Sequence, residues 1–169
     1  KGSYEVEKVA ETISPSKDIQ IASNFERLIY DLNKGDDSKT IKAMNDIKQK
    51  GKYIIDQEKL DKINTNFLSS KMSEEEVIKT IELVYKKFDV VLDPHSAIGY
   101  GAFDKVNISG NNIVLATAHP CKFPDAIKKA INLNAELPKE LMYILNEKEN
   151  YKVLDNNIDE VKKHIIERI

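Results

Sequence analysis

The stretch LATAHPCKFP, residues 115–124, gives the clearest indication of the fold. An apolar run at residues 111–116 leads into it, and a helical pattern over residues 124–131 follows directly. A strand followed at once by a helix is the repeating unit of α/β sheets. In such sheets ligands bind beyond the carboxyl ends of the strands, beside the N-termini of helices. The stretch therefore predicts an α/β fold with a site that contains Thr117, His119 and Lys122.

Most of the remaining chain shows helical patterns. An apolar stripe at helical spacing covers residues 24–33, and Ser23 with Glu26 fits a capping box at its start. Ser73 with Glu76 fits a second capping box, before an amphipathic helix that ends near residue 88. A β-branched run before residue 93 begins a second strand-then-helix unit, with Asp93-Pro94 at the helix start. Further helices are expected over residues 40–49, 56–68, 138–145 and from 157 onward, and residues 151–154 fit a short strand.

The composition narrows the classes of function. The chain has 169 residues, 41% apolar and 32% charged, as expected for one globular domain. A net charge of -2 without a clustered Lys/Arg stripe argues against nucleic acid or a membrane surface as partner. The single cysteine, Cys121, excludes a disulfide framework within the chain and fits a cytoplasmic location, and the three histidines predict no zinc cluster. No apolar run reaches the ~20 residues needed to span a bilayer.

Two residues of the 115–124 stretch, Lys122 and His119, each allow two interpretations. Lys122 precedes a helix N-terminus, where a cation is unfavourable unless an anion binds beside it, yet Asp125 could simply balance its charge. His119 is either a catalytic group or a loop residue that bonds a backbone carbonyl. Cys121 is interpreted as a small buried apolar residue.

Two other stretches are candidates for ligand contact. Asn24 and Arg27 lie in the first turn of a helix, where backbone N–H groups are free and Arg suits an oxyanion. Alternatively, Arg27 pairs with Glu26 or Asp31 on an exposed face. Gly99 and Gly101 each cost a helix roughly 1 kcal/mol relative to Ala, which suggests close packing against a neighbouring element or a flat ligand.

Three motifs together resemble one family. SPSKDIQIASNFERL at residues 14–28, LDPHSAIGYGA at 92–102 and LATAHPCKFPDA at 115–126 closely resemble the C-terminal part of threonine synthase. That family has the fold type II architecture of pyridoxal phosphate enzymes and converts O-phospho-L-homoserine and water to L-threonine and phosphate. The resemblance implies a partial α/β domain, with a short, mostly parallel sheet flanked by helices and a helical insertion at about residues 34–88. Ser96 and Cys121 depart from the family, which often has Thr and Ala there.

The resemblance also implies roles for individual residues. Pyridoxal phosphate would be bound by Thr117, at the ring nitrogen, and by Asp93 and His95 around the ring. The substrate or a phosphate group would be contacted by four residues: Asn24, Arg27, His119 and Lys122. No catalytic residue and no metal ligand is assigned in this chain.

The resemblance implies an incomplete enzyme. The family's Schiff-base lysine motif and its glycine-rich phosphate loop belong to the N-terminal part, and neither motif occurs in these 169 residues. Residues 1–169 are therefore expected to be the C-terminal part of the catalytic domain, inactive alone, without covalently bound cofactor and with the N-terminal part as its partner. Two alternatives stay open: a helical protein-interaction module formed by residues 34–88, and a small phosphate-ester enzyme centred on His119 and Lys122.

Overall fold

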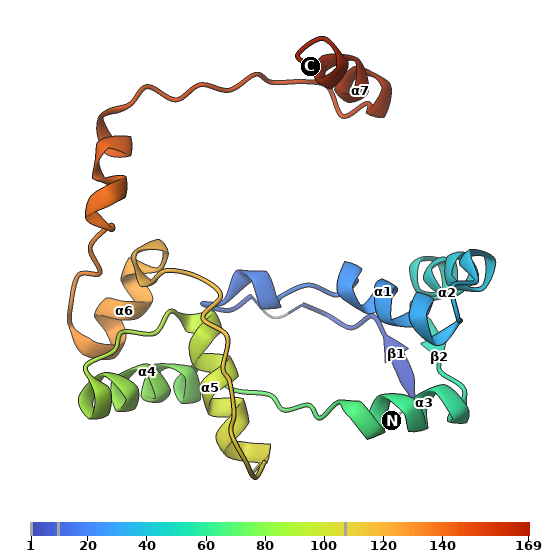
Figure 1. The fold of residues 1–169 in the computed structure, drawn as a ribbon, viewed down its shortest axis with the longest axis horizontal. Coiled ribbons are helices and arrows are strands. Elements are labelled where there is room, and N and C mark those ends of the chain that lie inside the picture. The colour runs from blue at the N-terminus through green and yellow to red at the C-terminus, as the bar shows by residue number, and fades with distance from the viewer. Residues whose placement is uncertain (1, 10, 107) are drawn as a thin grey trace. The chain divides into compact units, whose positions relative to one another are not determined.

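The computed structural model describes residues 2–9, 11–106 and 108–169. It divides into two compact units, Lys1–Glu136 and Leu137–Ile169. Helices dominate both units, and the described strands form one small sheet in the first unit (Figure 1). The elements of the first unit are β1 (Ser3–Glu5), η1 (Pro15–Lys17), α1 (Ser23–Leu32), α2 (Asp37–Lys50), β2 (Lys52–Ile54), α3 (Gln57–Asn66), α4 (Glu74–Phe88), α5 (Pro94–Val106), η2 (Pro120–Lys122) and α6 (Pro124–Ile131). The second unit contains η3 (Lys139–Asn146) and α7 (Ile158–Ile166).

The main core of the first unit lies where α5 and α6 pack against α4. Its buried members are Val77, Ile81, Ala97 and Ile127. Ile81 and Ile127 are completely buried, and full burial of such a side chain stabilises the fold by about 1.5–3 kcal/mol. This core fixes the N-terminus of α5 and the start of α6, the two helix ends that the sequence motifs occupy.

Gly101 permits the close approach of α5 to its neighbours. A Cβ atom at this position would overlap the Met72 thioether and lie 3.0 Å from Thr80 Oγ1 on α4. At Gly99 a Cβ atom would lie 3.3 Å from Val114 Cγ1. Of the two causes considered for these glycines, packing against neighbouring protein is the one that the structure supplies.

A second group of buried residues joins α1, α2 and the small sheet. Strand β1 pairs antiparallel with β2, with Tyr4 opposite Tyr53. Tyr4 stacks on Phe25 of α1 with ring centroids 4.4 Å apart, which ties the sheet to that helix. The buried side chains of the two helices are Ile29, Ala43, Met44 and Ile47.

The predicted helices are found with small changes in their bounds. The capping box of Ser73 and Glu76 is confirmed, and Asn157 caps α7 by accepting from the backbone of Asp159 and Glu160. The capping box at Ser23 is wrong: helix α1 already includes Ser23, its N-cap is Ala22, and no side chain caps it. The helix expected near residues 138–145 is a 3-10 helix, η3.

The expected strands are the main error. Residues 111–116, 151–154 and the run before Asp93 are not strands, and the mostly parallel sheet is replaced by the antiparallel pair β1–β2. A strand needs a neighbour for its backbone N–H and C=O groups. Within the described part of the chain no segment pairs with residues 111–116, which run as an exposed extended segment alongside α5 (Figure 1).

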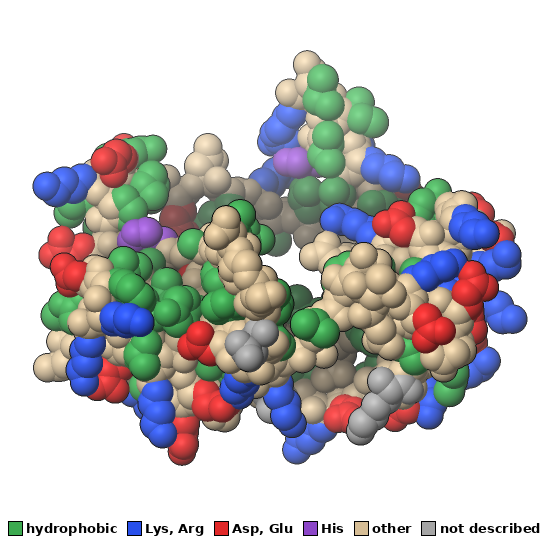
Figure 2. All heavy atoms as spheres, turned by 60° about the horizontal axis from the view of Figure 1, so that its bottom comes forward, with side chains coloured by type: hydrophobic (Ala, Val, Ile, Leu, Met, Phe, Trp, Pro, Cys, Tyr) green, Lys and Arg blue, Asp and Glu red, His purple; other side chains and the backbone are tan. Residues whose placement is uncertain are grey.

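The surface carries charges of both signs. On the face drawn in Figure 2, Lys and Arg side chains are interspersed with Asp and Glu side chains, and hydrophobic side chains reach the surface between them. Among the described helices none is long and apolar enough to cross a membrane.

Candidate functional site

Asp93 lies at the centre of a buried hydrogen-bonded network at the start of α5. Its Oδ1 atom accepts from the backbone N–H groups of His95 at 2.9 Å and Ser96 at 3.4 Å. This is the helix-start role that the Asp-Pro pair predicted, since Pro94 is the first residue of α5. Asp93 is only 1% exposed, so its carboxylate depends on these donors in place of water.

Ser96 connects Asp93 to the 115–124 stretch. Its hydroxyl donates to Asp93 Oδ2. Because the hydroxyl has a single hydrogen, its lone pairs remain free to accept, and Ser96 Oγ accepts from the backbone N–H of Thr117 at 3.0 Å. The backbone of Thr117 is thereby held against α5.

His95 connects the same carboxylate to the first motif. Its Nδ1 atom lies 3.1 Å from Asp93 Oδ1, and its Nε2 atom accepts from the backbone N–H of Ser16 at 3.3 Å. Because Nε2 accepts a hydrogen bond, the ring proton is assigned to Nδ1, where it donates to Asp93. The ring packs on Phe123, with centroids 4.8 Å apart. All three sequence motifs thus meet at this network.

A pocket of about 490 Å³ opens beside the network. Asp93 and Ser96 contribute to its wall, together with the two residues that flank Thr117, Ala116 and Ala118. Its other lining residues include Val91, Leu92, His119, Pro120 and Asn134. Thr117 itself is exposed and does not line this pocket, although both of its neighbours do.

Asn24 and Arg27 lie together on the exposed first turn of α1. Arg27 Nη1 donates to Asn24 Oδ1 at 3.1 Å. The alternative pairing of Arg27 with Glu26 or Asp31 is not found among the described residues. In the described structure no hydrogen bond or ion pair joins these two side chains to the Asp93 network. They are connected to it only along the backbone, because Ser16 of η1 bonds to His95 and lies shortly before α1 in the sequence.

His119 and Lys122 flank the short helix η2. His119 caps it, because its Nδ1 atom accepts from the backbone N–H of Cys121 at 3.2 Å. This differs from the expected bond to a backbone carbonyl. Lys122 is exposed, and the described residues place no carboxylate, Asp125 included, within ion-pair distance of it. Cys121 is half-buried and not fully buried as expected.

The sequence did not single out Ser14, Ser16 and Phe123. Ser14 is 1% exposed, and its Oγ atom has no hydrogen-bond partner among the described residues. Both serines belong to the SPSK segment of the first motif, so the motif pointed to this region. Periodicity could not show which residue of the segment contacts α5.

Comparisons with known proteins agree on one family. Residues 96–165 match the family model described as threonine synthase, C-terminal. The chain is 33% identical to the threonine synthase of Pseudomonas aeruginosa over 96% of its own length, and 35% identical to that of Saccharomyces cerevisiae over 98%. It covers 35% and 37% of those two proteins, so it spans about a third of the length of the curated relatives it matches.

Solved structures give the same result. The fold matches a crystal structure of PLP-bound threonine synthase from Brucella melitensis with a TM-score of 0.80 and 40% identity, over 97% of this chain and 36% of that one. It also matches the yeast threonine synthase structure with a TM-score of 0.75 and 33% identity, over 98% of this chain and 38% of that one.

Proposed function

The chain belongs to the threonine synthase family, whose C-terminal part it matches, and we propose that it supplies one wall of the cofactor and substrate pocket of such an enzyme. The reaction proposed is the conversion of O-phospho-L-homoserine and water to L-threonine and phosphate, carried out by a pyridoxal phosphate-dependent carbon–oxygen lyase. The match extends over nearly the whole chain, so the alternative of a separate helical interaction module is not favoured.

The observation that carries the proposal is the network that fixes Thr117 beside a pocket. The backbone of Thr117 is bonded to Ser96, and Ser96 is bonded to a carboxylate without solvent access. The Ser96–Asp93 bond is buried and therefore costly to break, so Ser96 is fixed and holds the Thr117 backbone, while residue 117 itself stays exposed. An exposed hydroxyl on a fixed backbone suits a hydrogen bond to a ligand.

Pyridoxal phosphate, when bound, supplies an electron sink through its pyridine ring. In the proposal the Thr117 hydroxyl meets the ring nitrogen, and Asp93 contributes to the wall beside the ring. His95 acts from behind that wall, because it is buried and holds the Ser16 backbone. These residues bind and orient the ring; they move no proton in the proposal.

Four exposed side chains are proposed for the phosphate group of the substrate: Asn24, Arg27, His119 and Lys122. Arg27 offers a planar set of donors suited to two phosphate oxygens, and its bond to Asn24 orients it. Lys122 has no carboxylate partner among the described residues, so its charge is available to an anion. The fixed backbone at Thr117 sets the position of the loop that carries His119.

The remainder of the site is proposed to come from residues outside this chain. The family's cofactor lysine and phosphate loop are not among the 169 residues, and residues 111–116 are extended and exposed. In the complete α/β domain of fold type II we propose that this segment pairs as a strand. Ile113 is 89% and Leu115 73% exposed, so such pairing would also cover apolar surface.

Phosphate release from O-phospho-L-homoserine tests the proposal. The chain alone should release none, while the chain together with the N-terminal part of the same enzyme should release phosphate and form threonine. In that assembly Thr117→Val should lower kcat at least about tenfold, by loss of one hydrogen bond to a charged or polar ring atom, and Thr117→Ser should retain activity. Turnover by the chain alone, or no turnover by the assembly, would contradict the proposal.

A further inference from the structure

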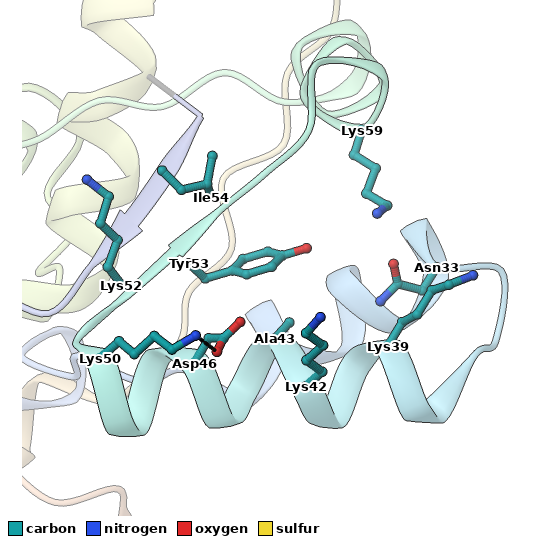
Figure 3. Close-up of a pocket in the computed structure, with 10 residues that line it drawn as sticks. All are labelled: Asn33, Lys39, Lys42, Ala43, Asp46, Lys50, Lys52, Tyr53, Ile54 and Lys59. Atoms are coloured by element: carbon teal, nitrogen blue, oxygen red, sulfur yellow. Dashed lines mark ion pairs between the residues drawn. The ribbon is translucent and has the colours of Figure 1, made fainter.

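A second pocket of about 570 Å³ lies between α2, β2 and α3, among residues that the proposed function does not use. Five lysines line it, together with Tyr53 and Asn33 (Figure 3). The lysines are Lys39, Lys42, Lys50, Lys52 and Lys59. In Figure 3 the Tyr53 ring extends across the cavity between α2 and α3, and Lys59 reaches down toward it from α3.

Secondary structure explains why these lysines share one cavity. Lys39, Lys42 and Lys50 come from α2, and the lining residues Ala43 and Asp46 complete a stripe at helical spacing. Tyr53 is the inward-facing residue of β2, whose two neighbours are exposed. Lys59 lies in the first turn of α3 and is itself only 20% exposed, so its position over the cavity is restricted.

Most of these lysines already have carboxylate partners. Lys39 pairs with Asp36 at 3.0 Å, and three pairs at 2.6 Å join Lys50 to Asp46, Lys52 to Glu5 and Lys59 to Asp56. Lys42 has no such partner among the described residues. The five lysines and these four carboxylates therefore leave one positive charge in excess, at Lys42.

Two of the paired lysines remain available to a stronger anion. Exposed ion pairs such as Lys39–Asp36 and Lys52–Glu5 contribute only about 0–1 kcal/mol, so these two lysine head groups can turn from a carboxylate to a ligand at little cost. The Tyr53 hydroxyl makes no hydrogen bond in the described structure and points into the cavity as a further donor (Figure 3). Asn33 is 7% exposed and fixed by its bond to Thr40, so this part of the wall is rigid.

We propose that this pocket binds a small phosphate monoester, with its phosphate between Lys42 and Lys59 and its organic part against the Tyr53 ring. A phosphate dianion matches several ammonium donors better than a carboxylate does, because it offers more oxygens and more charge. The aromatic ring gives a flat surface on which a planar organic group can stack.

Phenyl phosphate is the probe, because it carries both features in one small molecule. Backbone amide shifts of the full chain would be followed by NMR during titration with phenyl phosphate, and with inorganic phosphate for comparison. The largest shifts are expected at residues 39–43, 52–54 and 59, and phenyl phosphate should bind more tightly than inorganic phosphate. Shifts confined to other parts of the chain would overturn the proposal.

Matched variants separate a specific site from general attraction. Lys42→Ala should weaken phenyl phosphate binding about tenfold, as expected for one lost hydrogen bond to a charged group. Lys48→Ala removes the same charge from the same helix at an exposed position that does not line the pocket, and should change affinity less than about twofold. Equal losses in the two variants would mean that only net charge matters, and would overturn the proposal.

Lys122→Ala distinguishes this pocket from the anion contact in the proposed function. The variant should leave the shifts at residues 39–59 and the affinity there unchanged. Loss of those shifts in Lys122→Ala would contradict the proposal that the second pocket binds a phosphate monoester, and it would not affect the threonine synthase assignment. Conversely, an inactive assembly in which phenyl phosphate still binds at Lys42 would contradict the proposed function and would still support the second pocket as a binding site.

Discussion

At the scale of single residues, Asp93 is the residue on which the site depends. One carboxylate accepts from two backbone N–H groups, the His95 ring and the Ser96 hydroxyl. It thereby fixes the start of a helix, the loop at Ser16 and the backbone of Thr117. Removing it would leave its own donors at the start of α5 without a partner: the two backbone N–H groups, the His95 ring and the Ser96 hydroxyl.

Asp93→Ala should therefore lower the free energy of unfolding by about 2–4 kcal/mol, because its donors stay buried and unpaired. Urea denaturation followed by circular dichroism measures this change. Asp104→Ala, at an exposed position of the same helix α5, is the matched control and should change stability by less than about 0.5 kcal/mol. Similar midpoints for the two variants would show that the network is not important for stability.

The sequence predicted part of this arrangement. The Asp-Pro pair predicts a helix start from sequence alone, because Pro is favoured as the first helical residue and the carboxylate before it can reach the next backbone N–H groups. The bonds from His95 to Ser16 and from Ser96 to Thr117 join residues 79 and 21 positions apart, and no local pattern specifies them. Only the resemblance to a family brought these motifs together beforehand.

At the scale of elements, the N-terminus of α4 is tied to the C-terminal end of α5. Glu76 accepts from the Ser73 backbone within the capping box, and its other carboxylate oxygen pairs with Lys105 at 2.6 Å. The Lys105 bond first, and the Ser73 backbone bond second, hold the pKa of Glu76 at about 2, below its ordinary value of 4.5.

This lowered pKa gives a pH dependence of stability. The folded state holds Glu76 ionised down to about pH 2, whereas the unfolded chain takes up the proton near 4.5. The stabilisation is therefore complete above about pH 4.5 and is lost as the pH falls toward 2. Urea midpoints should decline more steeply between pH 5 and pH 3 for the parent chain than for Glu76→Gln. Parallel declines would contradict the assigned role of Glu76.

The core between α4, α5 and α6 gives a second prediction for the elements. Ile81→Ala should cost about 2–5 kcal/mol, because Ile81 is completely buried and its removal leaves a cavity. Leu83→Ala lies on the same helix at a position 52% exposed, and should cost less than about 1 kcal/mol. Thermal unfolding of both variants provides the measurement, and equal losses would argue against the core as described.

Helices were predicted better than strands for a physical reason. A helix satisfies its backbone within one segment, so the periodicity and caps of α4 were sufficient to place it. A strand is completed by a neighbour, and residues 111–116 have none among the described residues. The error at Ser23 is smaller: Ser and Glu at capping spacing were present, but the helix includes Ser23, and Ala22 occupies the N-cap position without a side-chain hydrogen bond.

At the scale of the whole molecule, the chain matches about a third of each threonine synthase yet carries three motifs that meet at one network. Composition and periodicity limited the fold class to helical or α/β, and they did not identify the chemistry. Family resemblance supplied the chemistry, and the structure adds how Asp93 connects the motifs. The lysine pocket around Tyr53 was not predicted, because its members come from α2, β2 and α3 and meet only in the folded chain.

The central claim is that the Thr117 hydroxyl, on a backbone fixed by Ser96, bonds the ring nitrogen of pyridoxal phosphate. The most direct measurement is the NMR shift of that nitrogen in isotope-labelled cofactor, bound to the assembly of this chain with the N-terminal part of the enzyme. The resonance should move in Thr117→Val and keep its parent position in Thr117→Ser, with cofactor bound in both. An unchanged resonance in Thr117→Val would contradict the claim.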